Sequence, residues 1–235
     1  MTQAVQVHPM ISIIVPVCKE LDGIASFVRH LKKVFSGHGH EIIVVDGSPE
    51  KETVSALNML EIQAVSSGKG RGKQMNAGAA MARGNILLFL HSDTLLPDNA
   101  PGLILKELGS QKEIIGGAFS LGIDSRQWSM KLIQLGANIR TCLTRVPYGD
   151  QAIFIQKDYF LDSGGFKEIP IMEDLELMTR IRKKNGRLVI IKEKVLTSPR
   201  RWNKEGAAKC TLRNWFLRLL YHFGVSPHRL TGFYQ

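Results

Sequence analysis

The stretch ILLFLHSDTLLPDN, residues 86–99, decides the fold of this chain. Five apolar residues in a row are typical of a short strand that is buried on both faces of a parallel sheet. The chain then turns polar at His91, Ser92, Asp93 and Thr94. Ligands of open parallel sheets bind beyond the carboxyl ends of the strands. A core strand that ends in an imidazole and a carboxylate therefore indicates a binding site.

The sequence around this strand predicts further strands with helices between them. Apolar runs rich in isoleucine and valine occupy residues 11–17, 41–47 and 61–67, and one apolar helical face lies between the first two. Strands that alternate with helices predict right-handed crossovers and a parallel sheet. After Pro97 the pattern is mixed. Strands are expected at 114–123 with a bulge at its paired glycines, at 151–156 and at 187–197, and helices at 128–142, 172–186 and 204–224. Gly186 is expected to cap the C-terminus of the second of these helices.

The composition is that of a globular protein. A chain of 235 residues with 44% hydrophobic residues can bury a full core. The longest apolar run, residues 10–18, is too short for a transmembrane helix, and the polar start lacks the features of a signal peptide, so we expect a cytoplasmic protein. Three widely spaced cysteines predict neither disulfides nor a metal site but small reduced core residues: Cys18, Cys142 and Cys210.

The net charge of +10 is concentrated in one part of the chain. Between Arg180 and Arg218 there are thirteen lysines and arginines and only two acids, and the remainder is about neutral. Such a basic face suits an anionic ligand or a phospholipid surface as well as nucleic acid. No motif of a known nucleic-acid-binding module accompanies it, so nucleic-acid binding is a minor alternative.

Polar side chains gather at the expected strand ends. They are Glu20, Asp46, the segment 66–71, His91 and Asp93. Carboxylates there suit the ribose hydroxyls of a nucleotide and a divalent cation, which prefers oxygen ligands. For Asp46 alone, capping of the next helix is an equal alternative.

The glycine-rich loop SSGKGRGKQMNAG, residues 66–78, matches neither the Walker pattern nor GxGxxG. Its glycines let the backbone approach a ligand closely, and Arg71 and Lys73 stand at a helix start, which favours an anionic ligand. A flexible surface loop remains the alternative.

Several of these motifs together resemble the family-2 glycosyltransferases with the GT-A fold. They are ISIIVPVCKE, EIIVVDGS, GRGKQMNAGAAMARGNILLFLHSDT, GGF and MEDLELMTRI, in that order, over about residues 11–201. YGDQAIF, TSPRRW and the ending LRNWFLRLLYHFGVSP resemble more narrowly a bacterial branch labelled arsenosugar-biosynthesis glycosyltransferases. The resemblance implies a single α/β domain over 1–235. Within it, about 10–97 is the nucleotide-binding half, about 98–202 the acceptor-side half and 203–235 a helical extension.

The resemblance implies roles for the polar residues that follow the strand at 86–90. Residues 91–93 occupy the place of the family's DxD motif, which implies that Asp93 binds the divalent metal, Mn or Mg, bridging the nucleotide diphosphate. His91 replaces the aspartate that faces the ribose. Histidine can bond a hydroxyl or join the metal, but one negative charge is lost, which implies weaker metal binding or reliance on Mn.

The resemblance also implies which residues contact the nucleotide. Pro16 and Glu20 belong to the family's first strand motif, Asp46 matches its aspartate on the base or ribose side, and Arg71 matches a basic residue near the nucleotide. Two residues depart from the first motif and imply a base pocket of different selectivity: Cys18 and Lys19.

The resemblance also implies the catalytic groups. MEDLEL resembles the family's ED motif and gives Asp174 the role of general base with Glu173 beside it. Adjacent carboxylates raise each other's proton affinity, whereas the helix dipole opposes this. Without the other motifs, an ordinary acidic first turn would be the better interpretation.

The remaining site residues are Arg200, Arg201 and Trp202, which resemble the family's basic-aromatic motif, and Asp150 and Gln151, expected on the acceptor side. Positive charge at the basic-aromatic motif would stabilise a departing diphosphate, and a solvated turn is the alternative.

The last helix carries more apolar surface than one docking face requires, between Arg213, Arg218 and Arg229. Peripheral contact with a membrane is one interpretation. Packing against the core and homodimerisation are the commoner ones.

We therefore expect an inverting, metal-dependent glycosyltransferase that moves a sugar from a nucleotide diphosphate donor, UDP-linked by preference, to a hydroxyl acceptor. A nucleotidyltransferase is disfavoured, because the first loop, VPVCKELDG, lacks a basic glycine-rich signature. The alternative of another class is a non-catalytic module that binds nucleotide, nucleic acid or anionic lipid.

Overall fold

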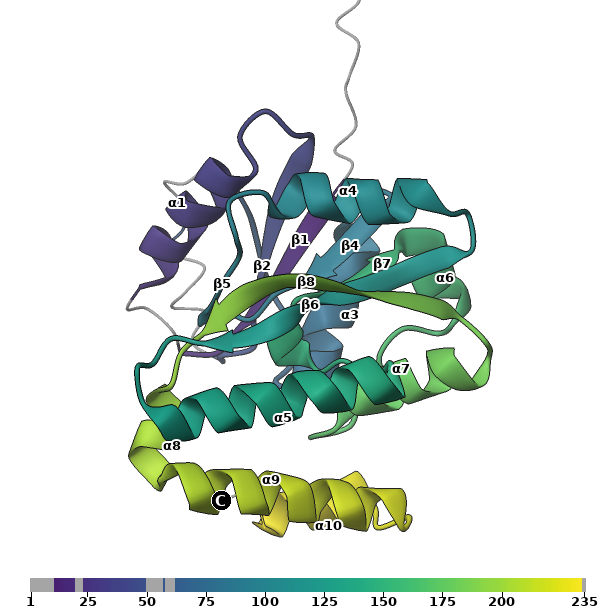
Figure 1. The fold of residues 1–235 in the computed structure, drawn as a ribbon. Coiled ribbons are helices and arrows are strands. Elements are labelled where there is room, and N and C mark those ends of the chain that lie inside the picture. Colours follow the sequence, from purple (N-terminus) through teal and green to yellow (C-terminus); the bar gives the residue numbers. More distant parts are fainter. Residues whose placement is uncertain (1–10, 20–22, 50–56, 58–61, 234–235) are drawn as a thin grey trace, which may run out of the picture.

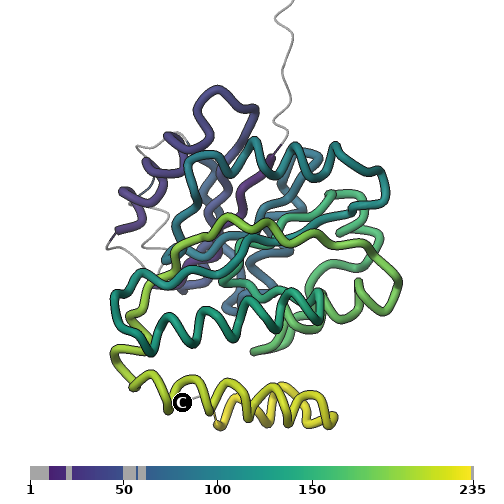
Figure 2. Tube along the Cα trace, viewed as in Figure 1, coloured from purple at the N-terminus to yellow at the C-terminus, as the bar shows by residue number. Residues whose placement is uncertain are grey.

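The computed structural model describes residues 11–19, 23–49, 57 and 62–233. Glu20, one of the predicted site residues, lies outside them. The described chain forms one eight-stranded sheet with helices on both faces (Figures 1 and 2).

The strand order is β3-β2-β1-β4-β7-β6-β8-β5. The first four strands form a parallel block: β1 (Ile11–Val17), β2 (His40–Asp46), β3 (Gln63–Ser66) and β4 (Ile86–Phe89). The second half adds β6 (Ile114–Ile123), β7 (Ile153–Gln156), β8 (Arg187–Thr197) and the short β5 (Thr94–Leu95). Strand β7 runs antiparallel to both β4 and β6, whereas β6 and β8 are parallel. The predicted mostly parallel sheet with a mixed second half is confirmed.

The helices form three groups around the sheet. One face packs against α1 (Ile24–Val34) and α4 (Ala100–Ser110). The other packs against α3 (Arg71–Met81), α6 (Lys157–Asp162) and α7 (Glu173–Lys183). A further layer holds α5 (Trp128–Thr144), α8 (Arg200–Glu205), α9 (Ala207–His222), α10 (Pro227–Leu230) and the 3₁₀ turn η2 (Thr231–Phe233), with α9 and α10 outermost in Figure 1. None of the described helices is long and apolar enough to cross a membrane.

The strands are apolar without alternation because both faces of the sheet are covered. In β1, Ile13 and Val15 pack into the core under α1 and α4, whereas Ile14 packs into the core under α3. Gly78 in α3 permits this close packing, since a Cβ there would lie 2.5 Å from Cγ2 of Ile14. Dense burial on both faces fixes the level at which each strand ends, and hence the position of the polar residues that follow.

Three sequence predictions need correction. Cys18 and Cys142 are exposed, and only Cys210 is a buried core residue. Cys18 follows the end of β1, and Cys142 lies on the outward side of α5. The residue in the left-handed conformation after α7 is Asn185, with φ of 59°, and not Gly186. A Cβ at Gly186 would lie 2.6 Å from Cγ2 of Ile181, so this glycine serves close packing.

Buried Glu41, at the start of β2, stabilises the end of the sheet that lies opposite the polar strand ends. Its carboxylate accepts hydrogen bonds from Ser12 Oγ at 2.6 Å and from the backbone N–H groups of Arg83 and Gly84 at 2.5 and 3.2 Å. Burial opposes ionisation, but the hydrogen bonds from Ser12, Arg83 and Gly84 together hold the pKa of Glu41 below its usual value. One carboxylate thereby joins β1, β2 and the segment that leads from α3 into β4.

We expect Glu41→Gln to destabilise the protein by roughly 1 to 3 kcal/mol, because an amide offers one acceptor oxygen where several donors converge. Urea unfolding monitored by circular dichroism measures the change. Glu193→Gln, the same substitution at an exposed position of β8, is the matched control. Equal stabilities of the two variants would contradict the structural role of Glu41.

Candidate active site

A cationic cleft of about 470 Å³ lies beyond the carboxyl ends of β1 and β4. It contains four basic side chains and a single carboxylate. The lining residues are Pro16, Arg71, His91, Ser92, Asp93, Arg200, Arg201 and Lys204. Positive charge of this density suits a ligand with several negative charges, such as a diphosphate.

The backbone explains why these groups meet. After β4, the N–H of Thr94 donates to the carbonyl of His91 at 3.1 Å, which turns the chain at the His-Ser-Asp segment. The N–H of Ser198, at the end of β8, donates to the carbonyl of Asp93 at 3.0 Å. Because α8 begins two residues later, at Arg200, this contact brings its basic residues to Asp93.

His91 is half-buried in the cleft. Its desolvation, aided by the charge of nearby Arg71, lowers the pKa of His91 to about 3. The imidazole is therefore neutral near pH 7 and can accept a hydrogen bond or act as a metal ligand. Asp93 is exposed to the cleft.

Among the described residues, no group of three His, Cys, Asp or Glu side chains converges in a way that could hold a metal by itself. A metal that binds together with a nucleotide requires less, because one or two carboxylates suffice when phosphate oxygens complete its coordination. Asp93, with His91 on the same turn, fits that second kind of site.

A second, more apolar cavity of about 400 Å³ lies between α5, α7 and α9. Arg71 lines both cavities, so they meet at the start of α3. The polar residues of the second cavity include Arg140, Asp150, Glu173 and Asp174. Its apolar wall consists of Leu121, Leu132, Ile133, Ala137, Ile171, Met172, Leu175, Trp202 and Trp215.

Asp174 is fixed by the backbone on two sides. Its Oδ1 accepts from the N–H of Leu175 and its Oδ2 from the N–H of Gly149, both at 2.7 Å. Gly149 also adjoins the His-Ser-Asp segment, because a Cβ at this position would lie 2.8 Å from Nε2 of His91. The glycine is the point at which the two carboxylate-bearing motifs come together.

Two further carboxyl groups near Asp174 have a raised proton affinity. Desolvation, with an added contribution from Asp174, raises the pKa of Glu173 to about 7, although Arg71 opposes the rise. Desolvation also raises the pKa of Asp150 to about 6 against the charge of Arg140. Such shifts are frequent at functional sites.

Sequence reasoning missed a cation–π cluster at this cavity. The guanidinium carbon of Arg140 lies 3.3 Å from the ring centroid of Tyr148, and Arg218 lies over the same ring and donates to its hydroxyl at 3.1 Å. The clue in the sequence was weak, because Arg140 is one of two cations in a largely apolar helix and Tyr148 precedes a short turn.

The other predicted site residues lie apart from the two cavities. Gln151 is fully buried; it accepts from Thr141 at 2.9 Å and donates to the carbonyl of Phe119 at 3.1 Å, which anchors α5 to the sheet. Asp46 is buried and accepts from the N–H and hydroxyl of Ser48 at 2.8 and 2.6 Å. Neither residue lines the cleft or the apolar cavity.

Comparison with known proteins agrees with this geometry. The model of the family described as "Glycosyl transferase family 2" matches residues 12–167. The chain belongs to glycosyl transferase family 2. No curated protein sequence is similar enough to be matched with it.

Three solved structures share its fold at low sequence identity. The mannosyltransferase PcManGT from Pyrobaculum calidifontis, in complex with GDP-Man and Mn²⁺, is 18% identical with a TM-score of 0.66 and 93% of this chain covered. Residues 1–349 of S. aureus TarS are 19% identical, with a TM-score of 0.61 and 80% of this chain covered. A mycobacterial protein is 18% identical, with a TM-score of 0.54 and 81% of this chain covered. This chain spans 63%, 60% and 65% of their lengths. The expected GT-A fold is confirmed.

The raised pKa of Glu173 predicts a pH-dependent stability. The folded protein holds this proton up to about pH 7 and the unfolded chain only to about pH 4.5, so the contribution of Glu173 to stability falls as the pH rises between these values. We expect Glu173→Gln to remove this fall and to be more stable than the parent at pH 8, by at most about 3 kcal/mol. Urea unfolding at pH 5 and pH 8 measures it. Glu168→Gln, at an exposed side chain, is the control, and an unchanged pH dependence in Glu173→Gln would refute the assignment.

Proposed function

We propose that this protein transfers a sugar from a nucleotide diphosphate donor to an acceptor hydroxyl. The observation that carries the proposal is the meeting of two cavities at Arg71, one cationic with Asp93 and one largely apolar with Asp174. A transferase with two substrates requires adjacent sites of this kind, because the donor's leaving group and the acceptor's nucleophile lie on opposite sides of the transferred group.

The cationic cleft is proposed to bind the donor diphosphate. Arg71, Arg200, Arg201 and Lys204 neutralise the charge that develops when the sugar leaves. Asp93 is the proposed protein ligand of a divalent cation that binds with the phosphate oxygens, and such a cation would supply further charge neutralisation. The PcManGT structure contains Mn²⁺ and GDP-Man, which supports a metal and a nucleotide sugar as ligands of this fold.

On the acceptor side, Asp174 is the proposed general base. Its carboxylate, held by Gly149 and Leu175, lines the apolar cavity and would take the proton of the acceptor hydroxyl as that oxygen attacks the anomeric carbon. A single displacement from the face opposite the leaving group inverts the configuration. Glu173, protonated up to about pH 7, would donate a hydrogen bond rather than compete for the proton.

The nucleotide and the acceptor class are finer proposals. UDP remains our preferred nucleotide by family resemblance. The narrower resemblance to the branch labelled arsenosugar biosynthesis suggests a polar acceptor, whereas the apolar wall of the acceptor cavity favours a less polar one.

The alternative is a module that binds a nucleotide without turnover, and Asp174→Asn distinguishes the two. The substitution keeps the size of the side chain but removes the base, so we expect hydrolysis of the bound donor, with water as acceptor, to fall by about 10²- to 10⁴-fold. Donor affinity should stay within about threefold of the parent, because Asp174 does not line the donor cleft.

The matched control is Asp158→Asn. Asp158 is the second residue of α6, as Asp174 is the second residue of α7, but Asp158 is exposed and lines neither cavity. Loss of activity in both variants would point to a general effect of acidic first turns. Full activity of Asp174→Asn would end the proposal of Asp174 as base.

The metal is tested by calorimetric titration of UDP and GDP in Mn, in Mg and in chelator. We expect one nucleotide to bind at least about tenfold more tightly with metal, and Asp93→Ala to abolish that difference. Asp98→Ala, at an exposed position outside the cleft, should bind as the parent does. Equal binding with metal and with chelator would mean that the four basic side chains of the cleft bind the nucleotide without a metal.

A further inference from the structure

Helices α5 and α9 present apolar stripes to solvent instead of to the core. On α5 the stripe consists of Trp128, Leu132, Leu135, Ile139 and Leu143, at helical spacing and each at least 50% exposed. On α9 and its C-terminal cap it consists of Leu212, Trp215, Phe216, Leu219 and Phe223, again each at least 50% exposed. Among the described residues these are ten of the fifteen exposed large apolar side chains, so the apolar surface is concentrated on two helices. Apolar exposure of this extent marks an interaction site.

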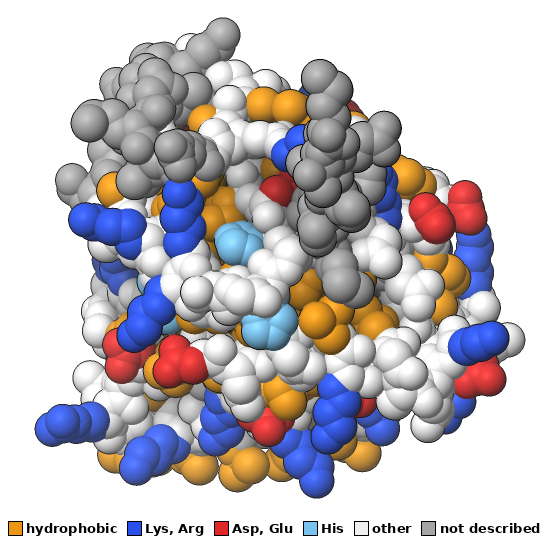
Figure 3. Space-filling model, turned by 90° about the horizontal axis from the view of Figure 1, so that it is seen from above, with side chains coloured by type: hydrophobic (Ala, Val, Ile, Leu, Met, Phe, Trp, Pro, Cys, Tyr) orange, Lys and Arg blue, Asp and Glu red, His pale blue; other side chains and the backbone are white. Residues whose placement is uncertain are grey.

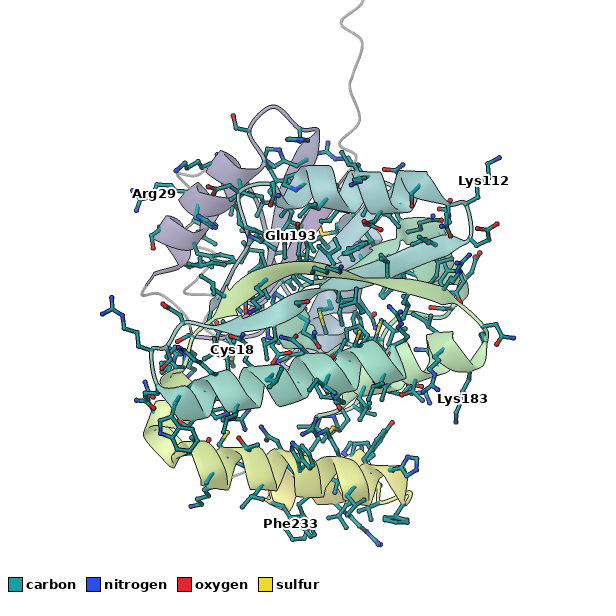
Figure 4. All side chains as sticks on the ribbon, in the orientation of Figure 1. Cys18, Arg29, Lys112, Lys183, Glu193 and Phe233 are labelled. Atoms are coloured by element: carbon teal, nitrogen blue, oxygen red, sulfur yellow. The ribbon has the colours of Figure 1, made fainter. Side chains whose placement is uncertain are left out.

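The two stripes flank the mouth of the acceptor cavity. Leu132 from α5 and Trp215 from α9 both line the cavity, yet they are 57% and 64% exposed. Phe233, which follows α10, extends the apolar surface on the side of α9 that faces away from the sheet (Figure 4). The cavity therefore opens onto apolar protein surface.

Inside the cavity the polarity reverses. Nε and Nη1 of Arg140 and Oδ1 of Asp150 are buried and have no hydrogen-bond partner among the described residues. Both residues line the cavity together with Asp174. An occupant that satisfies these atoms has a polar head at the buried end and an apolar body toward the mouth.

The charge around the stripes is mainly positive, although Glu205, just before α9, pairs with Arg213. Segments 125–149 and 206–235, which contain α5 and everything from α9 onward, carry eight lysines and arginines and no aspartate or glutamate. The opposite face shows side chains of both signs (Figure 3). Helices with an apolar stripe and flanking cations bind at the surface of anionic membranes. A second copy of the chain would bring like charges together.

We propose that α5 and α9 dock on an anionic membrane surface and that the acceptor is a membrane lipid with a hydroxyl head group. Its apolar chain enters the cavity between the two helices, and the hydroxyl reaches Asp174. The identity of the acceptor rests on the proposed function, whereas the membrane docking does not.

Docking is tested by sedimentation with vesicles of phosphatidylcholine, with and without 30% phosphatidylglycerol. We expect binding to the anionic vesicles, and a reduction of at least about tenfold in the Leu143→Glu/Leu212→Glu variant, which places charges in the stripes away from the cavity. Met81→Glu/Leu161→Glu is the matched control, because it introduces the same charges at exposed apolar residues elsewhere and should bind as the parent does.

The cavity is tested with monodecanoylglycerol, a soluble probe with one apolar chain and a hydroxyl head, below its micelle concentration. Trp202 and Trp215 line the cavity and report binding by fluorescence. Gly136→Phe fills the cavity, because Gly136 lines it and a Cβ there meets open space. We expect the probe affinity to fall at least about tenfold in this variant. The control is Gly102→Phe in α4, where a Cβ also meets open space, and it should bind the probe as the parent does.

The outcomes separate the two proposals. Vesicle binding that persists in Leu143→Glu/Leu212→Glu, or probe binding that persists in Gly136→Phe, overturns the lipid proposal. So does a dimer in solution that this double variant dissociates while vesicles remain unbound. If vesicles and probe bind as expected but neither UDP nor GDP binds with any metal, the membrane docking stands and the transferase proposal fails.

Discussion

The hydrogen bond from the N–H of Gly149 to Oδ2 of Asp174 is the contact on which the arrangement of the site depends. Gly149 belongs to the 3₁₀ turn η1 (Gly149–Gln151), which directly precedes β7, and Asp174 belongs to the first turn of α7. A side chain at Gly149 would collide with His91, so only glycine lets η1 lie against the end of β4 and the start of α7 together. Three segments that are distant in sequence thereby meet at one glycine.

Around that contact, the protein separates charges by their environment. Asp93 faces a cleft of four cations, whereas Glu173 and Asp150 lie in desolvated surroundings that raise their pKa to about 7 and about 6. Carboxyl groups with different proton affinities can serve as metal ligand, base and hydrogen-bond donor within one site. Arg71 stands between the two environments and lines both cavities.

The sequence predicted the strands well, because a strand that is buried on both faces appears as a continuous apolar run. The apolar runs at 11–17 and 187–197 coincide with β1 and β8, and the bulge expected at the glycines of 114–123 appears as a shift of register between Ile114 and Gly116. The motifs also named residues that line the two cavities, among them Arg71 and Asp174. Residues such as Arg140 and Tyr148 escaped, because their role depends on stacking between a helix and a loop, which no spacing in the sequence encodes.

The apolar stripe of α5 shows the limit of periodicity as a guide to packing. The spacing from Trp128 to Cys142 predicts an amphipathic helix, and periodicity alone implies that its apolar face packs inward. In the structure Met130 and Thr141 are the buried residues of this helix, while the apolar stripe faces outward. The fold does not need that stripe for its core, so its apolar side chains require another explanation. Helix α9 also presents an apolar stripe outward, and the cavity that holds Asp174 opens between the two stripes. A common ligand of both helices therefore accounts for the two stripes more simply than two independent causes.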